Sequence, residues 1–208
     1  MEQQTIPPRP AAQAVNMGKW ISDGWRLVEA DIGFFFLLTL IYSILVTILS
    51  STVIGFLLTG PLTAGFFYII FRKMRGQATD IGQIGKGFDF FAASLLSSVI
   101  ISAFVSIGLI FCILPGIVLM GLYLFTLPFV LEQKLDFWQA MEASRQAIKP
   151  YWFEFSIFVL VQSVILLLGL LFCFVGVFIA IPVCLAATAA AYRDMVGLAD
   201  ADGATVEV

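Results

Sequence analysis

Residues 90–131 read FFAASLLSSVIISAFVSIGLIFCILPGIVLMGLYLFTLPFVL and contain no Asp, Glu, Lys or Arg. Two further stretches share this property, Ile32–Phe71 and Phe155–Tyr192. One helical crossing of a membrane takes about 20 apolar residues. Each stretch is therefore long enough for two crossings. The sequence predicts an all-α, polytopic transmembrane bundle of about six membrane segments.

The overall composition indicates an integral membrane protein. Of the 208 residues, 61% are hydrophobic and 12% are charged, whereas a soluble domain carries about 25% charged residues. A net charge of −3 provides no basic surface for nucleic acid. The chain has no His and no CxxC spacing, so it lacks the ligand pattern of a zinc site. We expect no metal, no cofactor and no nucleic-acid partner.

Each charge-free stretch contains Gly and Pro residues that break a helix. These helix breakers are Gly60 with Pro61, Pro115 with Gly116, and Gly176 followed by Pro182. Proline breaks a helix interior but is tolerated in a first turn. We therefore interpret the stretches as three helical hairpins, at about 32–75, 90–132 and 153–196, in which Pro128 also breaks the fourth helix. They form one transmembrane domain at 16–197, between disordered tails at 1–15 and 198–208. The second arms are short, which leaves open whether each one spans fully.

The charges define a topology. All Asp, Glu, Lys and Arg side chains lie at 1–31, 72–89, 132–154 and 193–208, and none lies in the three breaker turns. With hairpins, these four segments share one side of the membrane. Because Lys and Arg are enriched on the cytoplasmic side, we expect a multi-pass protein of a cytoplasmic membrane with both termini inside.

A short phrase occurs twice, as GLIFCILPG at 108–116 and as GLLFCFVGV at 169–177. The matching cysteines, Cys112 and Cys173, leave open a disulfide near the far face of the membrane. The apolar surroundings favour a duplicated hairpin, because a buried cysteine behaves as a small hydrophobe. We therefore expect three pseudo-repeated hairpins, in which Gly116 and Gly176 matter more than the cysteines.

Amphipathic segments precede the hairpins. Met17, Trp20, Ile21, Gly24 and Val28 share one helical face, as do Phe137, Met141, Ser144 and Ile148. All four Trp lie in these segments, and indoles prefer the headgroup region. We expect interfacial helices in the cytoplasmic membrane surface. The alternative is a docking face for a soluble partner.

Small residues recur at intervals of four in two of the long helices. Such spacing lets helices approach closely in lipid, so we expect a packing seam. The alternative is a hydrophilic path through the bundle. Gln162 is the strongest interior polar candidate, and we expect it to bridge helices. The seam residues are Thr39, Ser43, Thr47, Ser51, Gly55 and Thr59 in the first long helix and Ser94, Ser98, Ser102 and Ser106 in the third.

No catalytic set is evident, since His is absent and the charge-free stretches hold no ionisable catalyst. Glu132 follows the break at Pro128, and Arg145 or Lys149 could pair with it at the membrane interface. With Ser144 these residues form a candidate interfacial polar site. We expect no enzymatic activity.

Two segments, GPLTAGFFYIIFRKMRG (60–76) and LPGIVLMGLYLFTLPFVLEQKLDFWQAMEASRQAIKPYW (114–152), carry a resemblance. They resemble an uncharacterised family of bacterial polytopic membrane proteins that is similar to the membrane domain of glycerophosphodiester phosphodiesterases. The matching residues are Gly60, Pro61, Gly65, Arg75, Gly76, Pro115, Gly116, Pro128, Glu132, Ala140 and Ser144. The resemblance implies a helical protein of the bacterial inner membrane, and it supplies no activity.

The sequence thus favours an integral membrane protein that acts by lipid or protein association, with envelope maintenance as a candidate role. Its expected partners are membrane lipids and either a second membrane protein or further copies of itself. The alternative is a carrier or channel for an apolar or amphipathic small solute. A carrier requires Ser, Thr and Gln side chains that face a cavity near the bilayer midplane.

The topology predicts that Gly76→Cys and Asp136→Cys stay unlabelled when intact cells are treated with a membrane-impermeant thiol reagent. Both become labelled once the cells are permeabilised, because both positions are cytoplasmic. Labelling of either position from outside intact cells would contradict the topology.

Overall fold

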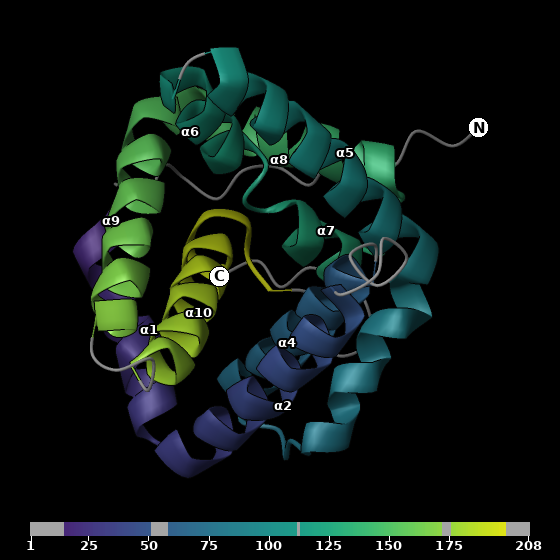
Figure 1. The fold of residues 1–208 in the computed structure, drawn as a ribbon, viewed down its shortest axis with the longest axis vertical. Helices are drawn as coiled ribbons and strands as arrows, with labels where there is room; N and C mark the ends of the chain where they lie inside the picture. The colour runs from purple at the N-terminus through teal and green to yellow at the C-terminus, as the bar shows by residue number, and fades with distance from the viewer. Residues whose placement is uncertain (1–14, 51–57, 112, 172–175, 199–208) are drawn as a thin grey trace.

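A computed structural model describes residues 15–50, 58–111, 113–171 and 176–198. Within these ranges every element is a helix and no strand occurs, so the all-α prediction is confirmed. In Figure 1 the other helices surround α10, which lies near the middle of the view. The helices are α1 (Met17–Glu29), α2 (Ile32–Ser50), α4 (Thr59–Met74), the 3₁₀ helix η1 (Ile81–Phe90), α5 (Phe91–Phe111), α6 (Ile113–Leu122), α7 (Thr126–Glu132), α8 (Phe137–Ile148), the 3₁₀ helix η2 (Lys149–Tyr151), α9 (Trp152–Leu171) and α10 (Val177–Val196).

Helix α10 is the centre of the fold and contacts α1, α2, α4 and α9. Its run AATAAA at 186–191 is entirely buried. A Cβ atom added to Gly24 of α1 would lie 2.7 Å from the backbone nitrogen of Ala187. The two helix backbones therefore touch, because Gly24 faces Ala187 across the crossing.

The amphipathic face of α1 lies against α10 rather than against the membrane surface. Trp20 is buried, and its indole Nε1 donates a hydrogen bond of 3.2 Å to Asp194. Lys19 forms an ion pair of 2.7 Å with the same carboxylate. The expectation that Trp20 sits among lipid headgroups is corrected, since α10 offers both an apolar surface and an acceptor for the indole. Three tryptophans are exposed, namely Trp25, Trp138 and Trp152.

The apolar face of α8 is also turned inward, since Met141, Ser144 and Ile148 are buried. Helix α8 contacts α7, α5 and α6. The amphipathic pattern predicted both helices correctly. Other helices of the protein cover the apolar faces of α1 and α8.

Two of the three breakers lie in the first turn of a helix, and the third begins at a helix N-cap. Gly60 and Pro61 occupy the first turn of α4, and Pro115 and Gly116 lie near the start of α6. The turns therefore precede the prolines, as expected for a residue that lacks an N–H and fits the first helical turn. Gly176 is the N-cap of α10. Pro182 lies inside α10 and does not end it, which corrects its assignment as a breaker.

The glycines of the repeated phrase face one another in pairs. A Cβ atom on Gly108 would lie 3.0 Å from the Cα of Gly116, so α5 and α6 almost touch. A Cβ atom on Gly176 would lie 2.6 Å from the carbonyl oxygen of Gly169. The first glycine of each phrase thus packs against a glycine near its end. Cys112 and Cys173 lie outside the described residues.

The described residues do not confirm the expected six membrane crossings. By length and composition, four helices of the described residues can cross a membrane, or five if α1 and α2 count as one span bent by 95°. Helix α4 has 16 residues, fewer than the about 20 that one crossing takes. Six spans and a threefold repeat are therefore not confirmed. The structure does confirm a helical protein with several helices apolar enough to span a membrane.

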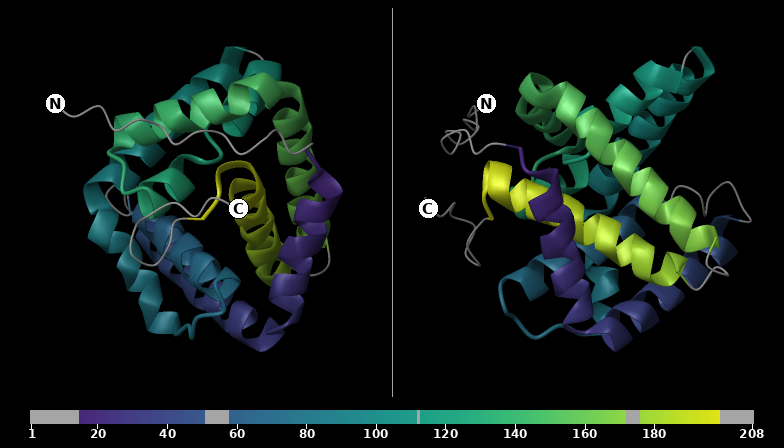
Figure 2. Two further views of the ribbon diagram at one scale, coloured as in Figure 1. Left: turned by 180° about the vertical axis from the view of Figure 1, so that it is seen from behind. Right: turned by 90° about the vertical axis from the view of Figure 1, so that its left-hand side faces the viewer.

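The start of α1 and the end of α10 lie on one side of the bundle, and the described ends of the hairpin helices lie on the other (Figure 2). In the right-hand view of Figure 2, the start of α1 and the end of α10 lie toward the labelled termini. The end of α2, the α5–α6 tip and the end of α9 lie on the far side in the same view. The charge-free turns are thus separated from the charged segments.

The crossing of α1 and α10 predicts opposite effects for two glycines of α1. Gly24→Ala should lower the free energy of unfolding by about 1–3 kcal/mol, because the new methyl meets backbone atoms. Gly18→Ala is the matched control. Its Cβ atom has only a contact of 3.7 Å with Asn16, and alanine gains up to about 1 kcal/mol in a helix.

Thermal unfolding in detergent micelles, followed by circular dichroism, measures both variants. Equal melting temperatures for the two would contradict the close contact of α1 with α10.

Candidate functional site

The polar groups of the fold gather around a break between α6 and α7. Helix α6 ends at Leu122, and α7 begins at Thr126 with Pro128 in its first turn. Leu124 N bonds to the carbonyl of Gly121 and Thr126 N bonds to that of Tyr123, which are tight-turn bonds. A proline in the first turn of a helix needs no N–H partner, so the break comes before Pro128 rather than at it.

Ser144 of α8 joins the two sides of this break. Its hydroxyl donates a hydrogen bond of 2.7 Å to the carbonyl of Leu122 and accepts one of 3.1 Å from the N–H of Phe125. Ser144 is buried. Two backbone groups that the broken helix leaves unpaired are thereby satisfied, which is necessary in a buried position.

Glu132 pairs with Arg75 at the end of α4, not with Arg145 or Lys149 as expected. The Glu132 side chain is almost completely buried. Arg145 instead pairs with Glu142, three residues earlier on its own helix, at 2.6 Å. Lys149 is exposed. The correction has a geometric reason, since α7 contacts α4 whereas Arg145 projects from the outer side of α8.

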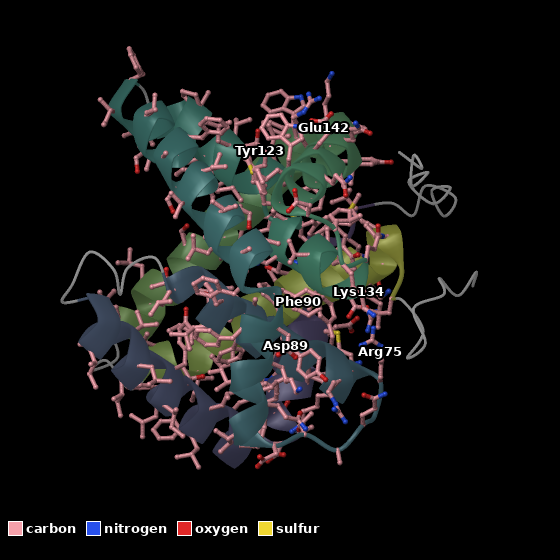
Figure 3. All side chains as sticks on the ribbon, turned by 90° about the vertical axis from the view of Figure 1, so that its right-hand side faces the viewer. Arg75, Asp89, Phe90, Tyr123, Lys134 and Glu142 are labelled. Atoms are coloured by element: carbon pink, nitrogen blue, oxygen red, sulfur yellow. The ribbon has the colours of Figure 1, made fainter. Side chains whose placement is uncertain are left out.

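Tyr192 of α10 lies beside the Arg75–Glu132 ion pair. Its buried ring makes edge contacts with Phe71 of α4, and with Phe125 and Phe129 at α7, at centroid distances of 5.1–5.7 Å. The ion pair and this ring together connect α4, α7 and α10. Figure 3 shows Arg75 and Lys134 on the side away from the α5–α6 tip.

A second ion pair anchors the corner between α1 and α2. Lys73 Nζ lies 2.6 Å from Asp31 Oδ2 and 4.4 Å from the centroid of the Phe34 ring. The hydrogen bond from Lys73 lowers the pKa of Asp31. The carboxylate is therefore charged at neutral pH, and the pair holds the α1–α2 corner against the end of α4.

A third polar contact joins α1 to the end of α10. Arg193 forms ion pairs with Asp23 at 2.8 Å and with Asp194 at 2.9 Å. The charges at the ends of the bundle thus pair between helices far apart in the sequence.

The seam residues divide into packed and exposed members. Ser94 is buried and Ser98 is partly buried, and a Cβ atom on Gly60 would lie 2.5 Å from the Ser98 hydroxyl. Thr39 is buried and bonds to the carbonyl of Phe35. Ser43 and Ser102 are partly buried, Thr47 and Ser106 are exposed, and Ser51 and Gly55 lie outside the described residues.

Gln162 bridges two helices, as its position predicted. Its amide nitrogen donates hydrogen bonds to the carbonyl of Cys184 at 3.2 Å and to the hydroxyl of Thr188 at 3.0 Å. Gln162 is buried. This amide therefore joins α9 to α10 inside the apolar core.

Among the described residues, no group of three or more His, Cys, Asp or Glu side chains could hold a metal ion. Comparisons with family models, curated proteins and solved structures gave no match to this chain.

The cap at the break predicts a loss of stability for Ser144→Ala of about 1–3 kcal/mol, because two buried backbone groups lose their partner. Ser163→Ala is the matched control, since that exposed hydroxyl bonds only to the carbonyl of Val159 in its own helix. The control should change stability by less than about 0.5 kcal/mol. Chemical denaturation in micelles measures both, and an unchanged Ser144→Ala protein would contradict the role of the cap.

Proposed function

We propose that this chain is a multi-pass protein of the bacterial cytoplasmic membrane that acts without catalysis, by association with lipid or with another membrane protein. The observation that carries this proposal is the bonding of Gln162 to α10. Gln162 is the interior side chain best suited to bind a polar solute. Its amide N–H groups already donate hydrogen bonds to α10. The proposed partners are membrane lipids and either a membrane protein or further copies of this chain.

The hydroxyl groups of α5 support the same function. Ser94 and Ser97 are buried, and each donates to a carbonyl in the preceding turn of its own helix. Ser98 lies against Gly60 of α4. These contacts are typical of a packed helix interface, whereas a solute carrier requires polar groups that face a water-filled site.

Other observations support the proposed location in a membrane. Each candidate span overlaps a charge-free stretch, and Arg75 and Lys134 lie on the side of the bundle away from the α5–α6 tip (Figure 3). The positive-inside rule then places both termini in the cytoplasm. The resemblance to the bacterial membrane-protein family adds the inner membrane and a candidate role in envelope maintenance.

The test compares two single-cysteine variants of a cysteine-free protein in lipid vesicles, Ser98→Cys in the seam and Gln139→Cys on the exposed side of α8. A small charged thiol reagent should modify Gln139→Cys and leave Ser98→Cys unmodified from either side of the vesicle. Phospholipid should also remain bound to the wild-type protein in native mass spectra.

Two results would contradict the proposal. Modification of Ser98→Cys at a rate close to that of Gln139→Cys would favour a carrier or channel. Protein free of bound lipid, combined with a single monomeric species in the membrane, would contradict association with lipid and with further copies of the chain.

A further inference from the structure

The most exposed large apolar side chains of the described residues include those that flank the α5–α6 turn. The exposed fractions are 82% for Ile110, 85% for Phe111, 69% for Ile113 and 71% for Leu114. No Asp, Glu, Lys or Arg occurs anywhere between 90 and 131. A turn that emerged into water would expose these side chains without a charged neighbour, so an apolar environment covers the tip.

The charged pair Glu142–Arg145 defines where the membrane surface lies beside this hairpin. The two side chains are 36% and 41% exposed and lie on the outside of the bundle. Exposed charges are costly in hydrocarbon, so the pair belongs at the headgroup level. Ser144 lies between them in the sequence and is bonded to the α6–α7 break. The break therefore lies at the same level, which Figure 3 shows by Tyr123 next to Glu142.

The depth of the tip follows from helix length. Helix α6 has 10 residues between the tip and the break, which is about 15 Å at 1.5 Å per residue. On the other arm, the ring of Phe104 contacts that of Tyr123 at a centroid distance of 6.3 Å. Phe111 lies two helical turns beyond Phe104, or about 10 Å. The hydrocarbon core of a bilayer is about 30 Å thick.

We propose that α5–α6 is a re-entrant hairpin. It enters the membrane from the side that carries Glu142 and Arg145 and ends near the bilayer midplane, where Phe111, Ile113 and Leu114 contact lipid acyl chains. This inference rests on the proposed membrane location and deepens it. The range Ile113–Glu132 is long enough to cross a membrane only when α6 and α7 are counted as one helix. The polar break before Thr126 divides the two helices.

Acyl chains are the occupant that the observations favour. The apolar surface of the tip continues along the sides of α5 and α9, where Ile107, Leu167 and Leu168 are exposed. Lipid can cover such a surface on every side. The close contact of Gly108 with Gly116 allows a narrow hairpin that needs no polar loop at its end.

The experiment uses the full-length chain without its native cysteines, carrying Leu114→Cys or Gln139→Cys modified with a nitroxide spin label. The labelled proteins are reconstituted into phosphatidylcholine–phosphatidylglycerol vesicles. Power-saturation electron paramagnetic resonance compares collisions with oxygen, which concentrates in the bilayer centre, and with a water-soluble nickel chelate. Ile113→Cys serves as a second tip variant in case Leu114→Cys does not fold.

The label at the tip should collide with oxygen and not with the nickel chelate, at a depth of about 15 Å below the phosphates on the α8 side. The Gln139 label should collide with the chelate. A tip label that reaches the chelate, or that lies at the far phosphates, would show a full crossing and overturn the inference. A tip label shielded from both reagents would also overturn it, since a second copy or another protein would then cover the tip.

Vesicle flotation separates this inference from the proposed function. Wild-type protein that fails to float with the vesicles after a carbonate wash would refute the membrane location, and with it the hairpin. Protein that floats while its tip label reaches the chelate refutes the re-entrant hairpin alone.

Discussion

The backbone contact between α10 and α1 determines how the remaining helices are arranged. The buried alanines at 186–191 leave no side chain that would hold Gly24 away. Once α1 lies on α10, Trp20 fills the core beside Phe155 and Phe158, and Asp194 accepts its indole N–H. In a bilayer, where lipid tails are as apolar as the helices, close packing of this kind is a main source of helix association. The other helices then pack around α10, with Gln162 bonded to its interior face.

Polar groups have a structural role at the places where regular helix stops. The break before Pro128 leaves backbone groups that Ser144 satisfies, and the end of α4 brings Arg75 to Glu132. Each of these contacts joins segments far apart in the chain. The ion pairs Arg75–Glu132 and Arg193–Asp23 are thus interhelical contacts.

The sequence predicted the helices and their apolar faces, because long stretches without charged residues allow few structures other than helices in a membrane protein. It did not predict what covers those faces. The amphipathic pattern of α1 fits a membrane surface and the surface of α10 equally well, and only the fold distinguishes them. The prolines likewise indicated interhelical loops. A proline fits an interhelical loop and the first helical turn after it equally well.

Partners of polar residues were the least predictable part of the candidate site. Glu132 was expected to pair with Arg145 or Lys149 because they are near in sequence, whereas Arg75 reaches it through the contact of α4 with α7. Ser144 was among the candidate residues, but its role as a cap depends on a break that only the folded chain defines. Asp194 and Tyr192 were missed, since nothing in their local sequence indicates the distant groups they meet.

The central claim is that small-residue contacts with α10 leave the interior packed and dry. An electron cryomicroscopy structure of the protein in lipid nanodiscs tests it most directly. The account predicts α1 in contact with α10 at Gly24, and the Gln162 amide bonded to Thr188 with no water beside it. A structure with α1 lying in the membrane plane, or with a water-filled path along Gln162, would contradict the account.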